Sequence, residues 1–280
     1  MICYLCPMKD KVVIITGASS GIGRALAVQF VKQGSMVVLA ARSKEKLLEV
    51  EASLQGYPGK VLVVPTDVSV EKECQRLVEK TVAVFGRIDI LINNAGISMR
   101  ALFCDLKLEV LERLMAVNFW GTVYCSKYAE PYLVKQRGSL VGVISIAGYQ
   151  GLPARTGYSA SKYAIRGFLD TVRIENLKTG MHVMIAAPGF TQSNIRFSAL
   201  TADATPQGAT PRKEKSMMSP EYCAYRIYWA IRRRKRSLIL TTQGKLTVLL
   251  NKLFPRFVDY ASYRLMEKEP NSPLQRYRHK

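Results

Sequence analysis

Cysteine, histidine and long apolar runs are scarce in this 280-residue sequence. Of its six cysteines, only Cys3 and Cys6 form a C-x-x-C, and no second pair or nearby histidine completes a zinc site. We therefore expect no metal, no ligand role for His182 or His279, and a reduced, intracellular protein. No apolar run reaches the roughly 20 residues that cross a bilayer. Residues 1–7 also lack the basic flank and apolar length of a signal peptide.

Acidic residues are few relative to basic ones. Lys and Arg number 41 against 21 Asp and Glu, a formal net charge of +20, and residues 211–280 alone hold 17 Lys and Arg against 5 Asp and Glu. The hydrophobic fraction of 48% excludes a largely disordered or fibrous chain. The charge suits an anionic partner: nucleic acid, an anionic membrane surface or an acidic protein. No nucleic-acid-binding motif accompanies it, so we expect no nucleic acid partner.

Short apolar runs alternate with segments of helical periodicity from residue 11 to residue 191. The runs are apolar on both faces, which suits a parallel sheet covered by helices on each side. The predicted strands are Val12–Thr16, Met36–Ala40, Val61–Val64, Ile88–Asn93, Leu140–Ser145 and Val183–Ala187. The predicted helices are Arg24–Gln33, Lys44–Leu54, Val70–Phe85, Leu108–Lys135 and Tyr158–Lys178. Repeated β-α-β units predict a single α/β domain with a doubly wound parallel sheet, a Rossmann-type three-layer sandwich.

The alternation breaks after Pro188. Residues 191–219 are polar and contain scattered Pro and Gly, which suggests a substrate loop rather than a plain connector. A helix at Pro220–Arg232 and a strand at Ser237–Leu240 are expected to complete the sheet. The expected division is an N-terminal extension (1–8), the main domain (9–241) and a basic, amphipathic C-terminal extension (242–280).

A glycine-rich loop, Thr16–Gly23, joins the first predicted strand to the first helix. Gly17 would make the tight turn, Gly21 would let the backbone approach a pyrophosphate, and Gly23 would let the helix pack closely on the strand. The helix N-terminus offers unpaired N–H groups and partial positive charge to phosphates. The position directly after a strand favours a dinucleotide site over a purely structural turn.

The end of the second strand indicates which dinucleotide binds. NAD sites place an acidic residue there for the ribose hydroxyl, but the segment Leu39–Ser43 has no carboxylate and carries Arg42. A guanidinium can bind the additional phosphate of NADP, which a carboxylate would repel. NADP(H) is therefore the expected cofactor; the alternative is that Arg42 is a solvated surface charge.

Tyr158 and Lys162 are four residues apart on a predicted helix and share a face. A free phenol has a pKa near 10. A neighbouring ammonium, together with the positive charge of an oxidised nicotinamide, favours the phenolate and lowers that pKa. Tyr158 would then serve as a general acid and base. Ser145, at the carboxyl end of its strand, lies where α/β sheets bind ligands and is expected to hold a substrate oxygen. A Tyr-x-x-x-Lys pair alone is common on helices and gains weight only from the glycine loop upstream.

These features resemble the classical short-chain dehydrogenase/reductase family over about residues 9–240. The motifs that carry the resemblance are Thr16–Gly23, Asp67-Val68, Asn93–Gly96, Asn118, Ser145, Tyr158–Lys162 and Pro188-Gly189. The resemblance implies that residues 9–241 form an NADP-binding catalytic domain with a catalytic tetrad of Asn118, Ser145, Tyr158 and Lys162. Together with the glycine loop and Arg42, the expected cofactor-binding residues are Gly17, Ser19, Ser20, Gly21, Ile22, Arg42, Asp67, Val68, Asn94, Ala95, Gly96, Tyr158, Lys162, Pro188, Gly189, Thr191 and Ser193.

The resemblance also implies a role for each member of the tetrad. Tyr158 would protonate the carbonyl as hydride leaves the nicotinamide, and Ser145 would orient that carbonyl. Lys162 would bind the nicotinamide ribose, and Asn118 would help to hold a water in a proton relay. Ser193 stands where the family usually has threonine, and it keeps the hydroxyl.

Apolar and methionine side chains gather in the loops Ser98–Phe103, Ala147–Thr156 and Phe190–Met218. Such side chains suit a greasy, irregular ligand. We expect the substrate-binding residues to be Ser145, Tyr149, Tyr158 and Phe190. The predicted activity is NADP(H)-dependent interconversion of a lipophilic secondary alcohol and its ketone, of a steroid, retinoid or lipid-like kind.

Two other functions remain open. One is reduction of a 3-oxoacyl group on an acidic carrier protein that docks on Arg232–Arg236. The other is a non-catalytic NADP-binding scaffold, against which the intact Ser145, Tyr158 and Lys162 argue.

The C-terminal extension alternates apolar and basic side chains and would suit an anionic membrane face, unless it packs on its own subunit or on a dimer partner. The expected location is cytoplasmic with peripheral membrane contact. The resemblance further implies a homodimer or homotetramer through the helices at Leu108–Lys135 and Tyr158–Lys178.

Overall fold

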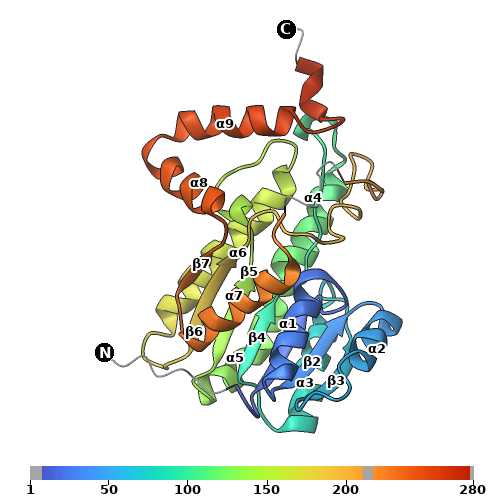
Figure 1. The fold of residues 1–280 in the computed structure, drawn as a ribbon, viewed down its shortest axis with the longest axis vertical. Helices are drawn as coiled ribbons and strands as arrows, with labels where there is room; N and C mark the ends of the chain where they lie inside the picture. Colours follow the sequence, from blue (N-terminus) through green and yellow to red (C-terminus); the bar gives the residue numbers. More distant parts are fainter. Residues whose placement is uncertain (1–7, 211–216, 278–280) are drawn as a thin grey trace.

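Seven parallel strands form one sheet, with the order β3-β2-β1-β4-β5-β6-β7, in the computed structural model, which describes residues 8–210 and 217–277 (Figure 1). The strands are β1 (Val12–Thr16), β2 (Met36–Ala41), β3 (Lys60–Pro65), β4 (Ile90–Asn93), β5 (Ser139–Val143), β6 (His182–Ala187) and β7 (Ser237–Ile239). The strand order reverses between β1 and β4, which pair in register with Val13 beside Ile90. Open α/β sheets bind ligands at the carboxyl edge of such a reversal.

Helices cover both faces of the sheet and confirm the doubly wound α/β fold (Figure 1). One face is covered by α1 (Gly21–Lys32), α2 (Lys44–Ala52) and α7 (Pro220–Arg232). The other is covered by α3 (Glu71–Phe85), α5 (Gly121–Lys135) and α6 (Thr156–Glu175). Every residue of β1 is buried, as a central strand with two covered faces requires. Phe30 of α1 meets Tyr228 of α7 edge to face, with ring centroids 5.2 Å apart.

The predicted long helix at Leu108–Lys135 has three parts. It begins as α4 (Leu108–Leu114), widens into a π-helix over Met115–Trp120, and continues as α5. The π-helix contains Asn118, whose side chain bonds both the N–H and the carbonyl of Ile97. A helical period predicts the helix but not this widened turn, which depends on a partner that is distant in the sequence.

The predicted strand Leu140–Ser145 ends earlier, at Val143. Ser145 therefore lies in the loop after β5, where its Oγ accepts a hydrogen bond of 3.2 Å from the N–H of Ala147. This bond caps the short 3-10 helix Ile146–Gly148. Two other short 3-10 helices lie at Phe103–Asp105 and Pro273–Tyr277.

The C-terminal extension forms α8 (Thr242–Leu253) and α9 (Pro255–Glu267), which lie beyond the carboxyl ends of the strands (Figure 1). Pro255 is at the first turn of α9, where a missing N–H is tolerated, and it marks the break between α8 and α9. None of the helices in the described part of the chain combines the length and apolar character that a bilayer crossing requires. The division into 1–8, 9–241 and 242–280 stays a prediction, and the Cys3–Cys6 pair lies outside the described residues.

Candidate active site

The glycine-rich loop leaves β1 at Thr16 and enters α1 at Gly21. Gly17 and Gly21 adopt φ values of +66° and +53°, which side chains disfavour. A Cβ at Gly23 would lie 2.2 Å from the carbonyl oxygen of Gly17, so helix and loop touch backbone to backbone. Ser20 at the N-cap makes no side-chain cap bond, which leaves the first N–H groups of α1 without that partner.

Asn93–Gly96, at the end of β4, supports this loop. The N–H groups of Asn94 and Ala95 each donate to the hydroxyl of Thr16 at 3.0 Å, and the Asn94 side chain donates to the Thr16 carbonyl at 3.0 Å. Ser193, from the loop after β6, also lies close to the glycine loop. A Cβ placed on Gly21 would be 3.2 Å from the Cβ of Ser193. Part of the motif therefore stabilises the turn itself.

A cavity of about 1130 Å³ opens at the carboxyl edge of the sheet. All residues expected to bind the cofactor line it: Gly17, Ser19, Ser20, Gly21, Ile22, Arg42, Asp67, Val68, Asn94, Ala95, Gly96, Tyr158, Lys162, Pro188, Gly189, Thr191 and Ser193. Three features fit a dinucleotide: a glycine loop whose space a Cβ would fill, a helix start without a side-chain cap, and the positive charge of Arg42. The carboxylate of Asp67 accepts from the N–H and hydroxyl of Ser69, so it is turned to its own loop.

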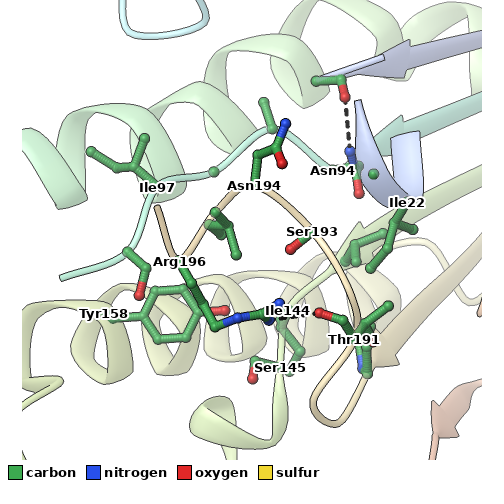
Figure 2. A pocket seen from close by; sticks show the side chains of 18 of the residues that line it. Ile22, Asn94, Ile97, Ile144, Ser145, Tyr158, Thr191, Ser193, Asn194 and Arg196 are labelled. Atoms are coloured by element: carbon green, nitrogen blue, oxygen red, sulfur yellow. Dashed lines mark hydrogen bonds between the residues drawn. The ribbon is translucent and has the colours of Figure 1, made fainter. Parts of the chain in front are cut away.

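Ser145, Tyr158 and Lys162 meet at the other side of the same cavity. The Ser145 hydroxyl and the Tyr158 phenol both line the cavity, and Figure 2 shows both beside the loop that carries Thr191 and Ser193. The Lys162 ammonium lies 5.7 Å from the centroid of the Tyr158 ring and donates to the carbonyl of Val143 at 3.1 Å. Burial lowers the pKa of Lys162 to about 8.

Burial raises the pKa of Tyr158, and the neighbouring Ser145 hydroxyl and the positive charge of Arg155 oppose that rise. The predicted lowering involves the charge of an oxidised nicotinamide as well as that of Lys162, so it stays a prediction.

Asn118 lies behind the cavity wall. It is fully buried, and its amide donates to the Ser161 hydroxyl at 2.9 Å as well as bonding Ile97. A Cβ on Gly96 would lie 3.1 Å from its side-chain oxygen and 3.4 Å from the Lys162 ammonium, so the three residues are neighbours. Asn118 thus links Ile97 and Ser161 directly behind the part of the cavity wall that contains Lys162.

The structure brings Phe190 to the cavity but not Tyr149. The Tyr149 ring packs against the core on the α6 side of the sheet, and the Arg166 guanidinium lies 4.1 Å from its centroid. Tyr149 was expected at the substrate because it belongs to the loop 147–156. Its side chain points instead into its own domain, which the position in a loop does not reveal.

Residues that the sequence did not single out complete the wall. From the C-terminal extension these are Gln243, Gly244, Thr247, Ser262, Leu265 and Met266. Arg155 and Arg196 also line the cavity, and Figure 2 shows Arg196 projecting into it. For Arg155 and Arg196, the only signal in the sequence is that they belong to loops already expected at the substrate. The residues of α8 and α9 carry no local motif, because the chain brings them to the cavity by folding back over its own sheet. Within the described residues no cluster of three or more His, Cys, Asp or Glu is arranged to hold a metal ion.

An α/β sheet that reverses at a glycine-rich loop, with Tyr and Lys facing the same cavity, is typical of nucleotide-dependent oxidoreductases. The profile described as short chain dehydrogenase matches residues 11–203. The chain belongs to the classical short-chain dehydrogenase/reductase family and is an oxidoreductase of that family.

Relatives with named activities cover most of the chain. An 11-beta-hydroxysteroid dehydrogenase-like 2 of Arabidopsis thaliana is 35% identical over 254 residues, covering 89% of this chain and 80% of the relative. A dehydrogenase/reductase SDR family protein 7-like of Drosophila melanogaster is 35% identical over 256 residues, covering 89% and 78%.

Two solved structures share the fold. A short-chain dehydrogenase/reductase from Burkholderia phymatum in complex with NAD has a TM-score of 0.80 at 24% identity, covering 90% of this chain and 96% of the other. An alcohol dehydrogenase from the archaeon Thermococcus sibiricus, complexed with 5-hydroxy-NADP, has a TM-score of 0.71 at 24% identity, covering 82% and 94%.

Proposed function

We propose that the chain is an NADP(H)-dependent oxidoreductase that interconverts a lipophilic secondary alcohol, of the hydroxysteroid kind, and its ketone. One observation carries the proposal: Ser145, Tyr158 and the glycine loop of α1 line one cavity. That arrangement provides a proton donor within reach of a bound carbonyl at the place where this fold holds a dinucleotide. Names of relatives such as the 11-beta-hydroxysteroid dehydrogenase-like protein agree with an alcohol–ketone reaction.

The catalytic steps assigned to this chain are transfers and placements of protons. A bound nicotinamide coenzyme supplies the hydride for reduction and accepts it in oxidation. Tyr158 donates the phenol proton to the carbonyl oxygen in reduction and removes the hydroxyl proton in oxidation. The Ser145 hydroxyl holds the same oxygen. With a pKa of about 8, Lys162 is largely protonated at neutral pH and can hold a ribose hydroxyl. Asn118 is proposed to help hold a water in a proton relay.

The cofactor is proposed to be NADP(H) because Arg42 lines the cavity at the end of β2, where no carboxylate stands. Arg24 and Lys46 also line the cavity and add positive charge for phosphates. Asp67 and Val68 are proposed to contact the adenine, and Asn94–Gly96 the adenosine ribose.

The substrate is proposed to be lipophilic because several large apolar side chains stand together, among polar ones, in the wall away from the glycine loop. Leu152, Phe190, Leu265 and Met266 contribute to it. Phe190 and Leu152 pack on the buried cluster of Leu102, Ala154, Met266 and Leu274, which gives that wall a fixed apolar backing.

The carrier-protein alternative has less support. Arg232–Arg236 lies between α7 and the start of β7, at the edge of the sheet opposite to the cavity. Several of its members are engaged in the fold: Arg234 donates to the carbonyls of Arg137 and Gly180, and the Arg232 guanidinium lies 4.7 Å from the centroid of Trp229. A carrier bound there would be remote from the reacting groups.

Two further properties belong to the proposal. The surface of α8 and α9 exposes apolar side chains among basic ones, which supports contact with an anionic membrane face; the apolar members are Leu246, Leu249, Leu253, Phe254, Phe257 and Tyr260. An exposed Trp120, stacked on Tyr124 with centroids 5.6 Å apart, and an exposed Tyr163 on α6 support association of two or four copies through these helices.

The decisive experiment is a screen of steroid, retinoid, fatty-acyl and small ketones, measuring NADPH consumption by absorbance. We expect turnover of a lipophilic ketone, and Tyr158→Phe should reduce kcat roughly a hundredfold or more because the proton donor is lost. The Tyr163→Phe variant, which alters an exposed phenol on the same helix, is the control. Equal rates for Tyr158→Phe and the parent would refute the proposed role.

A further inference from the structure

A second hollow lies beside the active-site cavity, between the beginnings of α7 and α8. It has a volume of about 510 Å³, and its polar lining residues are Ser219, Tyr222, Arg226, Thr241, Thr242 and Lys245. Thr241 also lines the active-site cavity, so the two spaces are neighbours. No step of the proposed reaction uses the other residues of this hollow.

The hollow is positively charged. Arg226 reaches it from α7, and Lys245 reaches it from the beginning of α8. Nη1 of Arg226 donates to the phenol oxygen of Tyr222 at 2.6 Å, and this neutral partner holds the guanidinium without balancing its charge. Within the described residues, no carboxylate lines the hollow. An anionic ligand would therefore be attracted by two cations and would meet no opposing charge from the described wall.

Hydroxyl groups add further hydrogen-bond donors to the hollow. The Ser219 hydroxyl accepts from the N–H of Tyr222 at 3.2 Å, and the Thr241 hydroxyl accepts from the N–H of Gly244 at 3.0 Å. A hydroxyl that accepts one such bond keeps its own hydrogen for donation. Thr242 brings a third hydroxyl and is exposed. Cations combined with O–H donors suit a phosphate group, which has several strong acceptor oxygens.

The exposed face of α8 that begins at the hollow continues as an apolar stripe. Leu246, Leu249 and Leu253 follow one another at spacings of three and four residues and are 53%, 56% and 62% exposed. Lys245 lies one turn before Leu249 on the same face of the helix. A phospholipid can place its phosphate in the hollow and its acyl chains along this stripe, whereas a free phosphate ion uses the hollow alone. The stripe therefore favours a lipid phosphate.

We propose that the hollow between α7 and α8 binds the terminal phosphate of a phospholipid headgroup, with Arg226 and Lys245 as its charged ligands. A phosphomonoester, as in phosphatidate, carries a charge of about −1.5 to −2 at neutral pH, which matches two cations better than the single charge of a diester. The inference rests on the membrane contact proposed for α8 and α9, which it narrows from a charged surface to one site.

Calorimetric titration of the full chain with dihexanoyl phosphatidate, a short-chain soluble lipid, tests this site directly. Arg226→Gln and Lys245→Gln should each raise Kd about tenfold, because each removes a charge-assisted bond to the phosphate. Arg226→Lys keeps the charge and should recover part of the affinity. Dihexanoyl phosphatidylcholine, which is zwitterionic, should bind the parent at least tenfold more weakly. Equal Kd values of the parent and Arg226→Gln for phosphatidate overturn the proposal.

The matched control is Lys252→Gln. It removes the same charge from α8 at an exposed position that does not line the hollow. Its Kd for dihexanoyl phosphatidate should stay within about twofold of that of the parent. A loss as large as that of Lys245→Gln would show that the net charge of α8 attracts the lipid, and the hollow would then not be the site.

Two further probes separate a lipid phosphate from a soluble one. Glycerol 3-phosphate and inorganic phosphate have no acyl chains, so the parent should bind both at least tenfold more weakly than dihexanoyl phosphatidate. Leu249→Ser should narrow that difference, because it shortens the apolar stripe. Equal binding of the three probes by the parent would indicate a site for free phosphate and would refute the lipid assignment.

Vesicle co-sedimentation distinguishes this site from general membrane contact. Phosphatidylcholine vesicles that contain phosphatidate or phosphatidylserine at equal surface charge differ only in the headgroup. The parent should bind the phosphatidate vesicles at least threefold more tightly, and Arg226→Gln should bind both alike. No preference in the parent would rule out the site and leave the membrane contact standing. Absence of vesicle binding, with calorimetric binding of phosphatidate retained, would refute the membrane contact and support the site. None of these measurements needs turnover.

Discussion

The proposed preference for NADP(H) depends on Arg42. Its guanidinium lines the cavity beyond β2, and Ser43 beside it is engaged as the N-cap of α2. A charge-assisted contact with a phosphate is worth about 1.5–3 kcal/mol, so Arg42→Ala should raise KM for NADPH roughly tenfold to a hundredfold. KM for NADH should change less than about twofold, because NADH lacks that phosphate.

Steady-state kinetics with both coenzymes checks this prediction. Lys44→Ala is the matched control, since it removes one positive charge from the start of α2 at a position that does not line the cavity. Equal losses for NADPH and NADH in Arg42→Ala would remove the basis for NADP(H).

Gly23 tests the backbone contact between α1 and the glycine loop. A methyl group there would lie 2.2 Å from the Gly17 carbonyl, so the helix must move and the phosphate cradle must open. We expect Gly23→Ala to weaken coenzyme binding at least tenfold, measured by fluorescence titration, and to lower the free energy of unfolding by more than about 1 kcal/mol.

Gly167→Ala is the control for that substitution. Gly167 lies within α6, and nothing is within 4 Å of a Cβ placed there. Alanine should leave coenzyme binding unchanged and stabilise the helix by about 0.5–1 kcal/mol. Similar binding losses in both variants would show that the close contact at Gly23 has no special weight.

Motif residues were predictable from the sequence because their chemistry is local. Gly17 and Gly21 have the positive φ that the loop requires, and Arg42 lines the cavity as the missing carboxylate suggested. The inward packing of Tyr149 was not predictable, since it depends on which way a side chain points after the chain has folded. Spacing fixes a shared helix face but not the direction of the Lys162 ammonium.

At the scale of elements, the sequence predicted the type and order of the helices and strands better than the residues at which they begin and end. The strand Val12–Thr16 and the helix Pro220–Arg232 have the predicted bounds, since a fully apolar run and a Ser-Pro start mark their limits. The π-helix at Met115–Trp120 holds Asn118 against the distant Ile97, and β5 ends early before the local Ser145–Ala147 cap; periodicity contains neither contact. Pro255 did mark the break between α8 and α9.

The exposed surface of α8 and α9 provides a prediction about an element pair. Leu249 and Phe257 are 56% and 60% exposed, and the same helices carry the basic Lys252 and Arg256 close to them in sequence. If this surface contacts anionic lipid, Leu249→Glu with Phe257→Glu should reduce co-sedimentation with phosphatidylserine vesicles at least tenfold, because both apolar burial and charge attraction are lost.

The control is Leu177→Glu, at a side chain 74% exposed that lies just beyond the C-terminus of α6. It should bind vesicles as the parent does. Undiminished binding of the α8–α9 variant, or no binding of the parent at low salt, would contradict membrane contact through this surface.

For the whole molecule, we expect the free energy of unfolding to depend on pH through a buried histidine at the amino-terminal edge of the sheet. His182, the first residue of β6, is buried there. Its Nδ1 lies 3.0 Å from the hydroxyl of Ser139 at the start of β5, and its Nε2 lies 2.9 Å from the carbonyl of Lys235, just before β7. Because the carbonyl only accepts, Nε2 carries the proton and Nδ1 accepts from the serine. The neutral ring thus joins the beginnings of three strands.

Burial lowers the pKa of His182 to about 4, with the charges of Arg234 and Arg173 acting in the same direction. In the unfolded chain the pKa is near 6.5. Between these values the unfolded chain binds a proton that the folded chain excludes, so the contribution is complete above about pH 6.5 and is lost as pH falls toward about 4. The loss amounts to about 3 kcal/mol of the free energy of unfolding.

Urea denaturation of the parent and of His182→Gln at a series of pH values measures this contribution. Glutamine keeps a donor and an acceptor but does not titrate, so the variant should be less stable than the parent above about pH 6.5 and approach or pass it near pH 4. Carboxylates titrate in both proteins and cancel in the difference. If the parent and His182→Gln showed parallel dependence of stability on pH, His182 would be protonated equally in the folded and unfolded states. That result would contradict a neutral His182 ring joining β5, β6 and β7.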